Sequence, residues 1–268
     1  MLRQIAAAAL ALSASALLAQ SPVSPPTPRP KFDAFEVATI KPVENDAKSG
    51  RYLIMQGVNR FIGKNYTLKL LIAAAWNLSP KTISGGPSWI ESDHWDIVAV
   101  TPGDLRPNHD EQMSMLRTLL TDRFKLAFHR EQKDFSIYQL EIAQGGPKLK
   151  PSATAPDEQP QLISTVYPQS IVLPARNVSM SDLAILMQRA MLDRPVVDKT
   201  GLSGKFDFDL EWAPDETQFG GEVPIASADA PNPPLFTALQ QQLGLKLEAT
   251  RGPVQALIVD AVERPTAN

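Results

Sequence analysis

The residue types best suited to catalysis or binding lie together in one stretch, ISGGPSWIESDHWDIVAV, at positions 83–100. Nucleophilic hydrolysis needs a serine, a base within hydrogen-bonding distance and a third group that orients the base. Ser88, His94 and Asp96 supply these residue types, with His129 as a second possible base. Glycosidase chemistry would instead need two carboxylates across a cleft, for which Glu91 and Asp96 are the nearest pair. One candidate function is therefore a hydrolase acting on peptide or carbohydrate, with its site at Trp89–Asp96.

The sequence around these residues lacks the motifs that usually accompany such chemistry. GGPSW is not G-x-S-x-G, and GLSG lacks the strand-turn-helix setting of a nucleophile elbow. In an extended segment only His94 and Asp96 would share a face, and two ligands are too few for a metal site. No phosphate-binding glycine motif is present either. We therefore expect no metal and no cofactor.

A binding role is the alternative for the same stretch. Tryptophan is enriched at binding hot spots, although it is equally common in cores. We take four residues of the stretch as candidate binding residues: Pro87, Trp89, His94 and Trp95.

Two segments of the chain resemble each other, RFIGKNYTLKLLIAAAW at 60–76 and VLPARNVSMSDLAILMQRA at 172–190. In each, an extended stretch leads through Asn-x-Thr or Asn-x-Ser into a helical pattern. Thr67 and Ser179 stand at the expected N-caps, and Asp182 completes a capping-box variant. One buried helix face is predicted in each segment from the spacing of Leu68, Leu71, Ile72, Ala75 and Trp76, and of Leu183, Leu186, Met187, Ala190 and Met191.

A glycine-bearing turn followed by an aromatic residue, an aspartate and an apolar residue also occurs twice. The aspartates are Asp96 in Trp-Asp-Ile and Asp207 in Phe-Asp-Phe. We predict that both accept backbone N–H bonds where a strand begins. With them, we assign a structural turn role to Gly85, Gly86, Gly201 and Gly204.

The second half of each segment predicts a short helix followed by two strands. LRTLLTDRFKLAFHRE at 116–131 aligns with LFTALQQQLGLKLEATR at 235–251. After each helical pattern, apolar residues alternate with the period of two typical of a half-buried strand. A further alternating stretch follows each, at 135–143 and 254–262, so we predict a hairpin in each copy.

These patterns predict an α+β fold with two tandem copies of one β-α-β-α-β-β unit. Runs of strand, helix and hairpin without regular βαβ alternation favour open mixed sheets with helices on one face. Proline-rich segments mark the joints. The predicted organisation is a signal peptide at 1–19, a Pro-rich tether at 20–31, a first repeat at 32–144, a linker at 145–161, and a second repeat at 162–268 with a long loop at 213–234.

The first residues, MLRQIAAAALALSASALLAQSP, combine one basic residue, an apolar run and small residues, as in a secretory signal peptide. The run is too short for a confident membrane span, and no later run is long enough to cross a bilayer. The chain contains no cysteine, which excludes disulfides, thiolate chemistry and a lipoprotein anchor. We therefore predict a secreted or periplasmic protein without a membrane span in its mature chain.

Composition adds two exclusions. The chain is 43% hydrophobic and 21% charged, values typical of an ordinary globular protein. Its formal net charge of −3 gives no reason to expect a nucleic-acid partner. The sequence does not indicate an oligomeric state.

Several stretches are similar to a soil-associated, acidobacterial family of secreted proteins of unknown function. They cover nearly all of residues 32–265: FEVATIKP, RFIGKNYTLKLLIAAAW, ISGGPSWIESDHWDI, MLRTLLTDRFKLAFHRE, GGPKLKP, RPVVDKTGLSGKFDFDLEW and LFTALQQQLGLKLEATRGPVQALIVDAVERP. This resemblance implies no activity, substrate or catalytic residue. More loosely, each half resembles the short N-terminal domain of secretins and TonB-dependent transducers, as residues 177–210 illustrate, which implies protein contacts in the cell envelope.

The sequence thus favours a secreted or periplasmic, non-catalytic protein of the cell envelope. Its expected partner is an envelope protein or peptide, which an open sheet edge would accept as an added strand. The hydrolase with a site near Trp89–Asp96 stays as one alternative. A sensor or inhibitor domain for a membrane-bound protease is the other.

Overall fold

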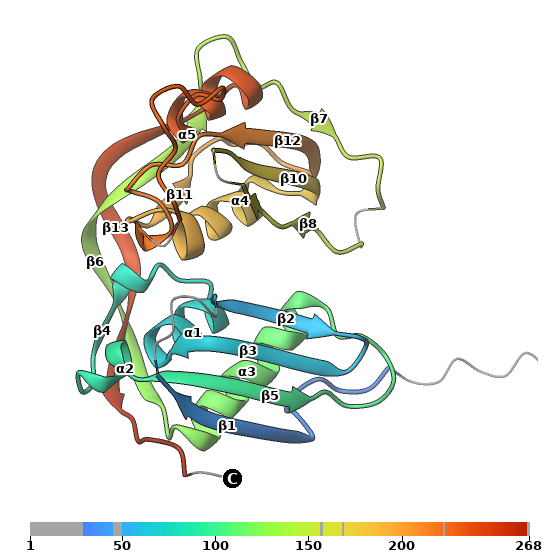
Figure 1. The fold of residues 1–268 in the computed structure, drawn as a ribbon, viewed down its shortest axis with the longest axis vertical. Coiled ribbons are helices and arrows are strands. Elements are labelled where there is room, and N and C mark those ends of the chain that lie inside the picture. Colours follow the sequence, from blue (N-terminus) through green and yellow to red (C-terminus); the bar gives the residue numbers. More distant parts are fainter. Residues whose placement is uncertain (1–28, 45–49, 156–157, 168, 222, 267–268) are drawn as a thin grey trace, which may run out of the picture.

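The chain folds into two lobes joined by a long two-stranded ribbon (Figure 1). The computed structural model describes residues 29–44, 50–155, 158–167, 169–221 and 223–266. The predicted signal peptide and residues 20–28 of the predicted tether lie outside the described residues. Within the described ranges, no helix has both the length and the apolar character that a membrane crossing requires.

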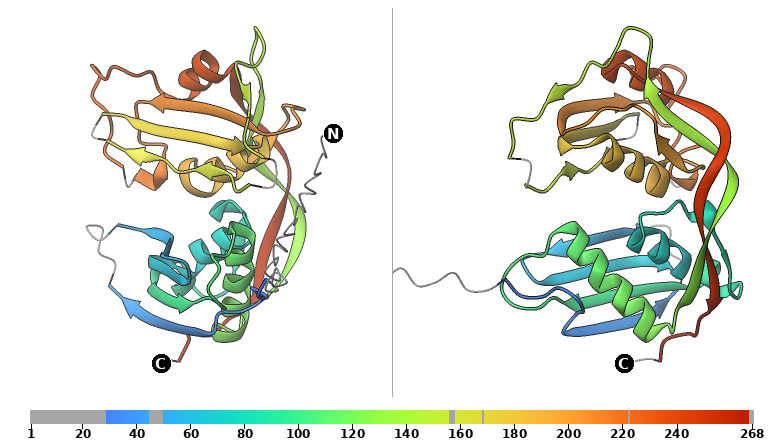
Figure 2. Two further views of the ribbon diagram at one scale, coloured as in Figure 1. Left: turned by 90° about the vertical axis from the view of Figure 1, so that its right-hand side faces the viewer. Right: turned by 180° about the vertical axis from the view of Figure 1, so that it is seen from behind.

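Lobe 1 is built on a four-stranded antiparallel sheet in the order β1-β5-β3-β2. One face is covered by α1 and α3, and α3 lies across the sheet in the right-hand view of Figure 2. The elements are β1 (Val37–Val43), β2 (Tyr52–Gln56), β3 (Arg60–Thr67), α1 (Leu68–Ala75), the 3₁₀ turn Pro80–Thr82, β4 (Ile83–Gly85), α2 (Trp89–Ser92), β5 (His94–Val100) and α3 (His109–Arg123).

Both main helices of lobe 1 begin at a side-chain cap. The predicted N-cap Thr67 is confirmed, since its side chain accepts the N–H of Leu70 at 3.3 Å. Helix α3 begins earlier than predicted because Asn108 and Glu111 form a capping box. Each side chain there accepts the other residue's backbone N–H, which satisfies two donors that the helix itself leaves unpaired.

Lobe 2 has a sheet of similar design in the order β7-β12-β10-β8, with β9 also paired to β10. Its helices α4 and α5 each continue directly into a π-helical turn. The elements are β7 (Lys150–Pro151), β8 (Gln161–Leu162), β9 (Thr165–Val166), β10 (Ile171–Val178), α4 (Met180–Leu186), the π turn Met187–Met191, β11 (Val196–Asp198), β12 (Phe206–Trp212), the 3₁₀ turn Phe219–Gly221, α5 (Leu235–Ala238) and the π turn Leu239–Leu243.

Ser179 caps α4 as predicted and forms a full capping box with Asp182. The segment 145–161, predicted to be a linker, instead contributes β7 and the first residue of β8 to the sheet of lobe 2.

The ribbon consists of β6 (Ala127–Ile142) and β13 (Leu245–Ala261), which pair antiparallel along their whole length. The two predicted hairpins are therefore wrong. Each pair of alternating stretches is one continuous strand, and the two strands pair with each other. Between the stretches of β6 lies HREQKD, which contains no glycine or proline to make a turn. In β13, Gly252 and Pro253 lie within the ladder, opposite Phe135 and Asp134.

Each lobe also receives strand residues from the other half of the chain. The short strand β4 pairs in parallel with β13, and β11 pairs in parallel with β6. At one end of the ribbon, Leu257 and Val259 of β13 pack into the core of lobe 1. At the other end, Tyr138 and Leu140 of β6 pack into the core of lobe 2. The two cores are distinct, but neither is made from one half of the sequence alone.

The fold is a mixture of helices and strands with several open sheets, which agrees with the predicted class at that level. Elements follow one another in the same order in the two halves, β3-α1-β4-β5-α3-β6 and β10-α4-β11-β12-α5-β13. The final pair of strands in the predicted six-element unit is replaced in each half by one long strand.

Candidate functional site

The residues proposed for hydrolysis do not form a catalytic group. Ser88 is an exposed residue that makes no side-chain cap bond to α2. The Nδ1 atom of His94 lies 2.9 Å from the carbonyl oxygen of Ser92. Asp96 is occupied by an ion pair with Lys64. Because no hydrogen bond links the serine, the histidine and the aspartate, the main version of the hydrolase hypothesis loses its support.

The structure does not support the other combinations of residues proposed for hydrolysis either. His129 pairs with Asp260 on the ribbon, with 2.8 Å between Nδ1 and Oδ1. Glu91 is exposed and forms an ion pair with Lys69 at 2.8 Å, which lowers the pKa of the Glu91 carboxyl. A glycosidase general acid needs a raised pKa, so Glu91 is unsuited to that role.

The candidate binding residues are divided between surface and core. Pro87 is exposed, and His94 is half-buried. Trp89 is half-buried beneath Arg264, whose guanidinium carbon lies 4.9 Å from the ring centroid. Trp95 is only 4% exposed and packs edge-on against Phe124 in the core of lobe 1. Trp95 is therefore withdrawn as a binding candidate, because its ring offers no surface to a partner.

Glycine is required at the predicted turn positions for different physical reasons in the two lobes. Gly85 has φ +81°, and a Cβ atom there would lie 2.6 Å from the carbonyl oxygen of Val259, so β4 approaches β13 only because residue 85 has no side chain. Gly86 also has positive φ and packs against Val259. Gly201 and Gly204 have positive φ with open space around them. These four glycines serve backbone geometry.

Asp96 and Asp207 hold matching backbone irregularities. Asn65 in β3 and Asn177 in β10 have φ values of 56° and 57°, and the strand register shifts at both places. Asp96 accepts the N–H of Asn65, and Asp207 accepts the N–H of Asn177, each at 2.9 Å. The bond from Asn177 is the main cause of a lowered pKa at Asp207. Both aspartates are therefore explained by strand geometry.

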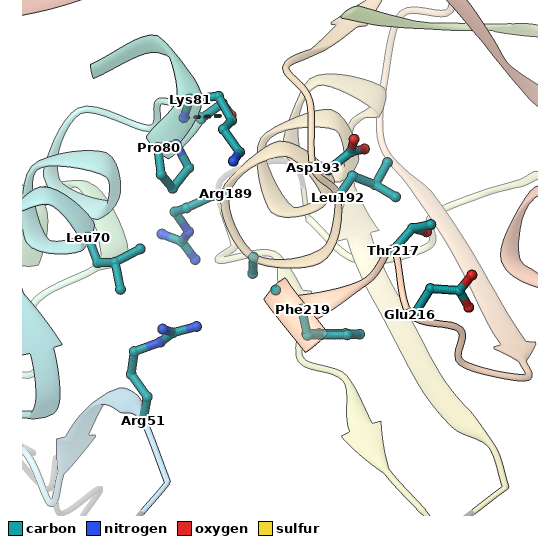
Figure 3. Close-up of a pocket in the computed structure, with 13 residues that line it drawn as sticks. Arg51, Leu70, Pro80, Lys81, Arg189, Leu192, Asp193, Glu216, Thr217 and Phe219 are labelled. Atoms are coloured by element: carbon teal, nitrogen blue, oxygen red, sulfur yellow. Dashed lines mark hydrogen bonds between the residues drawn. The ribbon is translucent and has the colours of Figure 1, made fainter. Parts of the chain in front are cut away.

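A better candidate site is a cavity of about 370 Å³ between the lobes (Figure 3). Arg51, Leu70 and Lys81 line it from lobe 1. Lobe 2 contributes the end of the α4 helix and the loop that follows β12. Its lining residues there are Arg189, Ala190, Leu192, Asp193, Glu216, Thr217, Phe219 and Gly220.

Arg189 is the most unusual residue of this cavity. It lies on the π-helical turn after α4, and its side chain extends toward Leu70 and Pro80 of lobe 1 (Figure 3). Desolvation by burial lowers the pKa of its guanidinium. Among the described residues, no carboxylate or carbonyl accepts a bond from this group. π-helical turns are rare and are frequent at functional sites, which supports a role for this one.

One direct bridge joins the two sides of the cleft near this turn. The Nε2 of Gln188 donates to the carbonyl oxygen of Asn77 in lobe 1 at 2.8 Å. Its Oε1 accepts the N–H of Val196 in lobe 2 at 3.3 Å. Gln188, the residue next to Arg189, is therefore bonded to both lobes.

A protein-family model described as "Protein of unknown function (DUF3738)" matches residues 69–262. The chain belongs to this family. Its DUF3738 region contains all of α1 except Leu68, both ribbon strands and the whole of lobe 2, and it includes Lys81 and Arg189 of the cleft. Arg51 precedes it. No curated protein and no solved structure matches the chain.

The cleft of this DUF3738 protein is suited to holding a ligand. It combines three cationic side chains, two carboxylates and an apolar floor that includes Leu70 and Phe219. Within the described ranges, no cluster of three or more histidine, cysteine or acidic residues could hold a metal ion. Sequence reasoning missed the cleft because its lining comes from separate segments. One signal was available, since Arg189 is the single charged residue in the apolar pattern LAILMQRAML.

Proposed function

We propose that this chain is a secreted or periplasmic, non-catalytic binding protein of the cell envelope, which holds its ligand between two lobes. The observation that carries the proposal is the cavity of about 370 Å³ that residues of both lobes line. Ligand sites occur preferentially at domain interfaces and have volumes of roughly 300–1,000 Å³. A small molecule, or one or two residues of a peptide, would fit this space.

The connection between the lobes supports a hinged mode of binding. Each lobe packs its own apolar core, and in the part of the chain that the structure describes, β6 and β13 make the connections between the lobes. Gly252 and Pro253 lie at the middle of this ribbon. Proline donates no ladder hydrogen bond there, and glycine has no side chain to stiffen the strand. Closure of two lobes around a ligand is a common form of domain movement.

We further propose that the two halves are tandem copies of one unit. The shared order of elements supports this, and so do the matched bonds of Asn65 with Asp96 and of Asn177 with Asp207. Within its family, we place the chain in the soil-associated, acidobacterial group. The loose likeness of residues 177–210 to the short domain of secretins and TonB-dependent transducers supports an envelope protein or peptide as the partner.

Spin labels on the two lobes provide the test. The chain has no cysteine, so the double variant Asp122→Cys/Gln240→Cys carries one label on α3 of lobe 1 and one on the last π turn of lobe 2. Both positions are exposed. The distance between the labels is measured by pulsed electron resonance, alone and with short peptides, small carboxylates, phosphates and neutral sugars. The melting temperature is recorded in parallel.

We expect one of these ligand classes to shorten and narrow the distance distribution. At a hundred times the dissociation constant, the same class should raise the melting temperature by about 5 to 10 °C. If no class changes either quantity, the cleft is not a ligand site and the proposal fails. Mass spectrometry of the recovered ligand tests the non-catalytic part, which chemical conversion of the ligand would contradict.

A further inference from the structure

We propose that the cleft binds an oxyanion, a carboxylate or phosphate group of its ligand, on the guanidinium of Arg189. This inference rests on the proposed function and specifies the chemical class of the ligand. It is drawn from a charged side chain that enters the cavity between the lobes and has no partner of opposite charge among the described residues (Figure 3).

Arg189 is half-buried, and a guanidinium that is partly removed from water without a partner lowers the stability of a folded protein. Buried charges are normally paired or fully hydrogen-bonded, and leaving one unpaired destabilises the fold strongly. Arg51, the other arginine that lines the cavity, has a partner, and so do two arginines outside the lining. Arg194 bonds to Asp193 at 3.4 Å, and Arg117 bonds to the carbonyl oxygen of Ala75 at 2.8 Å. Arg189 has no such partner among the described residues, as expected for a group that a ligand completes.

The charges around Arg189 favour an anion. Arg51 and Lys81, both from lobe 1, lie on the same side of the cavity as Arg189 (Figure 3). Arg51 is positioned over the ring of Tyr66, with 5.7 Å between the guanidinium carbon and the ring centroid. An oxyanion at Arg189 would therefore meet cationic groups from both lobes and would favour the closed cleft.

The two carboxylates of the cavity do not neutralise this side. Asp193 accepts the hydroxyl of Tyr138 at 3.2 Å and the Nε of Arg194, so it is already engaged. Glu216 lies with Asp193 on the opposite side of the view (Figure 3). The three cations and two acids leave one net positive charge in the lining.

The shape of the guanidinium decides between kinds of anion. Its planar donors match the two oxygens of a carboxylate or phosphate, which gives a bidentate pair that chloride cannot form. Leu70, Pro80 and Phe219 border the cavity and offer apolar contact to the rest of the ligand. The expected ligand thus has an oxyanion attached to a small apolar group.

Nitrogen-15 spectra of arginine Nε groups in the full chain test this inference directly. Inorganic phosphate and sodium acetate are titrated separately into the millimolar range, with sodium chloride at equal ionic strength as the control. We expect phosphate or acetate to move the Arg189 resonance and to raise the melting temperature beyond the chloride control. The more effective anion identifies the ligand group as phosphate or carboxylate.

Two substitutions and a control locate the effect. Arg189→Gln should weaken binding of the effective anion by roughly ten- to hundred-fold, because a charge-assisted pair is lost. Arg189→Lys keeps the charge without the fork and should bind with intermediate strength. Arg130→Gln removes an exposed arginine of the ribbon, which is bonded to Gln255, and should leave binding unchanged.

Stability without anions gives a second readout. Because Arg189→Gln removes an unpaired charge, it should raise the melting temperature of the ligand-free protein, and this gain should disappear at saturating anion. The inference is overturned if phosphate and acetate act no more strongly than chloride, or if their effect persists in Arg189→Gln. Anion binding at Arg189 without a change in the spin-label distance would instead contradict the hinged closure alone. If a neutral ligand closes the lobes of the Arg189→Gln variant, that result would contradict the anion inference and leave the proposed ligand site between the lobes intact.

Discussion

The backbone N–H of Asn177 lies 2.9 Å from Oδ1 of Asp207, in lobe 2, where β10 leaves its regular register. The same bond joins Asn65 to Asp96 in lobe 1. Asparagine tolerates the left-handed backbone that both positions adopt, and the carboxylate satisfies an N–H that the shifted ladder leaves unpaired. Each bond thus fixes the turn of the chain from a strand into the following helix.

The bond at Asp207 predicts a specific dependence of stability on pH. The pKa of this carboxyl is lowered from its ordinary value of 3.8, first by the N–H of Asn177. The unfolded chain therefore binds the proton more readily, so the stabilisation is complete above about pH 4 and is lost as the pH falls further. Asp207→Asn should destabilise the protein at pH 7, and the difference from the parent should shrink between pH 4 and pH 2 in urea unfolding.

A neighbouring substitution controls for loss of charge. Asp209→Asn removes an acid two positions along β12, where the carboxylate is exposed and pairs with Arg176. It should cost little, because exposed ion pairs contribute little. Equal effects of the two substitutions would show that the bond to Asn177 has no special role.

The close approach of β4 to β13 predicts unequal effects at two glycines. Gly85→Ala must place a methyl group 2.6 Å from the carbonyl oxygen of Val259 and must also hold φ at +81°. Gly201→Ala meets only the cost of φ +66°, about 1 kcal/mol, because nothing lies near its Cβ position. Gly85→Ala should cost about 2 kcal/mol more than this. Denaturant unfolding measures both, and equal costs would contradict the close approach.

The two buried tryptophans Trp212 and Trp95 should differ in how much a substitution by phenylalanine lowers the free energy of unfolding. In lobe 2 the Nε1 of Trp212 donates to Oε1 of Gln218 at 2.7 Å, and both side chains are buried. In lobe 1 the Nε1 of Trp95 is buried without an acceptor among the described residues. Trp212→Phe strands a buried acceptor, so it should cost about 1 to 3 kcal/mol more than Trp95→Phe. Unfolding free energies test this, and a larger cost for Trp95→Phe would refute it.

The position of Arg189 predicts a change in the titration of His109, at the start of α3. Although His109 keeps contact with solvent, desolvation lowers its pKa, and Arg189 lowers it further. Arg117 acts in the same direction, while Asp110 and Asp182 oppose it. Arg189→Gln should therefore raise the pKa of His109 toward its ordinary value of 6.5, as followed by magnetic resonance of the imidazole. Arg130→Gln should leave it unchanged. An unmoved pKa in Arg189→Gln would place the two groups too far apart to interact.

Local signals in the sequence were sufficient to predict the starts of two helices. Thr67 and Ser179 mark the starts of α1 and α4 because a hydroxyl that accepts an N–H three residues on is a short-range interaction. Asp96 and Asp207 could be picked out for the same reason, since a recurring polar residue beside a turn points to a backbone bond. The coarse fold class followed from these elements.

The ribbon and the cleft depend on contacts that no local pattern contains. Two alternating stretches in series suit a hairpin as well as one long strand, and only the pairing of β6 with β13 distinguishes them. The cleft brings together Arg51, Lys81 and Arg189, which lie far apart in the sequence. Tryptophan is a residue type common at binding hot spots, but Trp95 is buried as a core residue is. Only the fold distinguishes these two roles.

The exchange of strands between the halves constrains the order in which the two lobes can fold during synthesis. Leu257 and Val259 complete the core of lobe 1, and β4 has no partner strand until β13 arrives. During vectorial synthesis, about nine-tenths of the chain must emerge before the last strand of the N-terminal lobe, β13, begins to appear, by which time most of lobe 2 is already available. A chain cut between residues 144 and 162 should therefore yield two incomplete fragments that regain structure only when mixed.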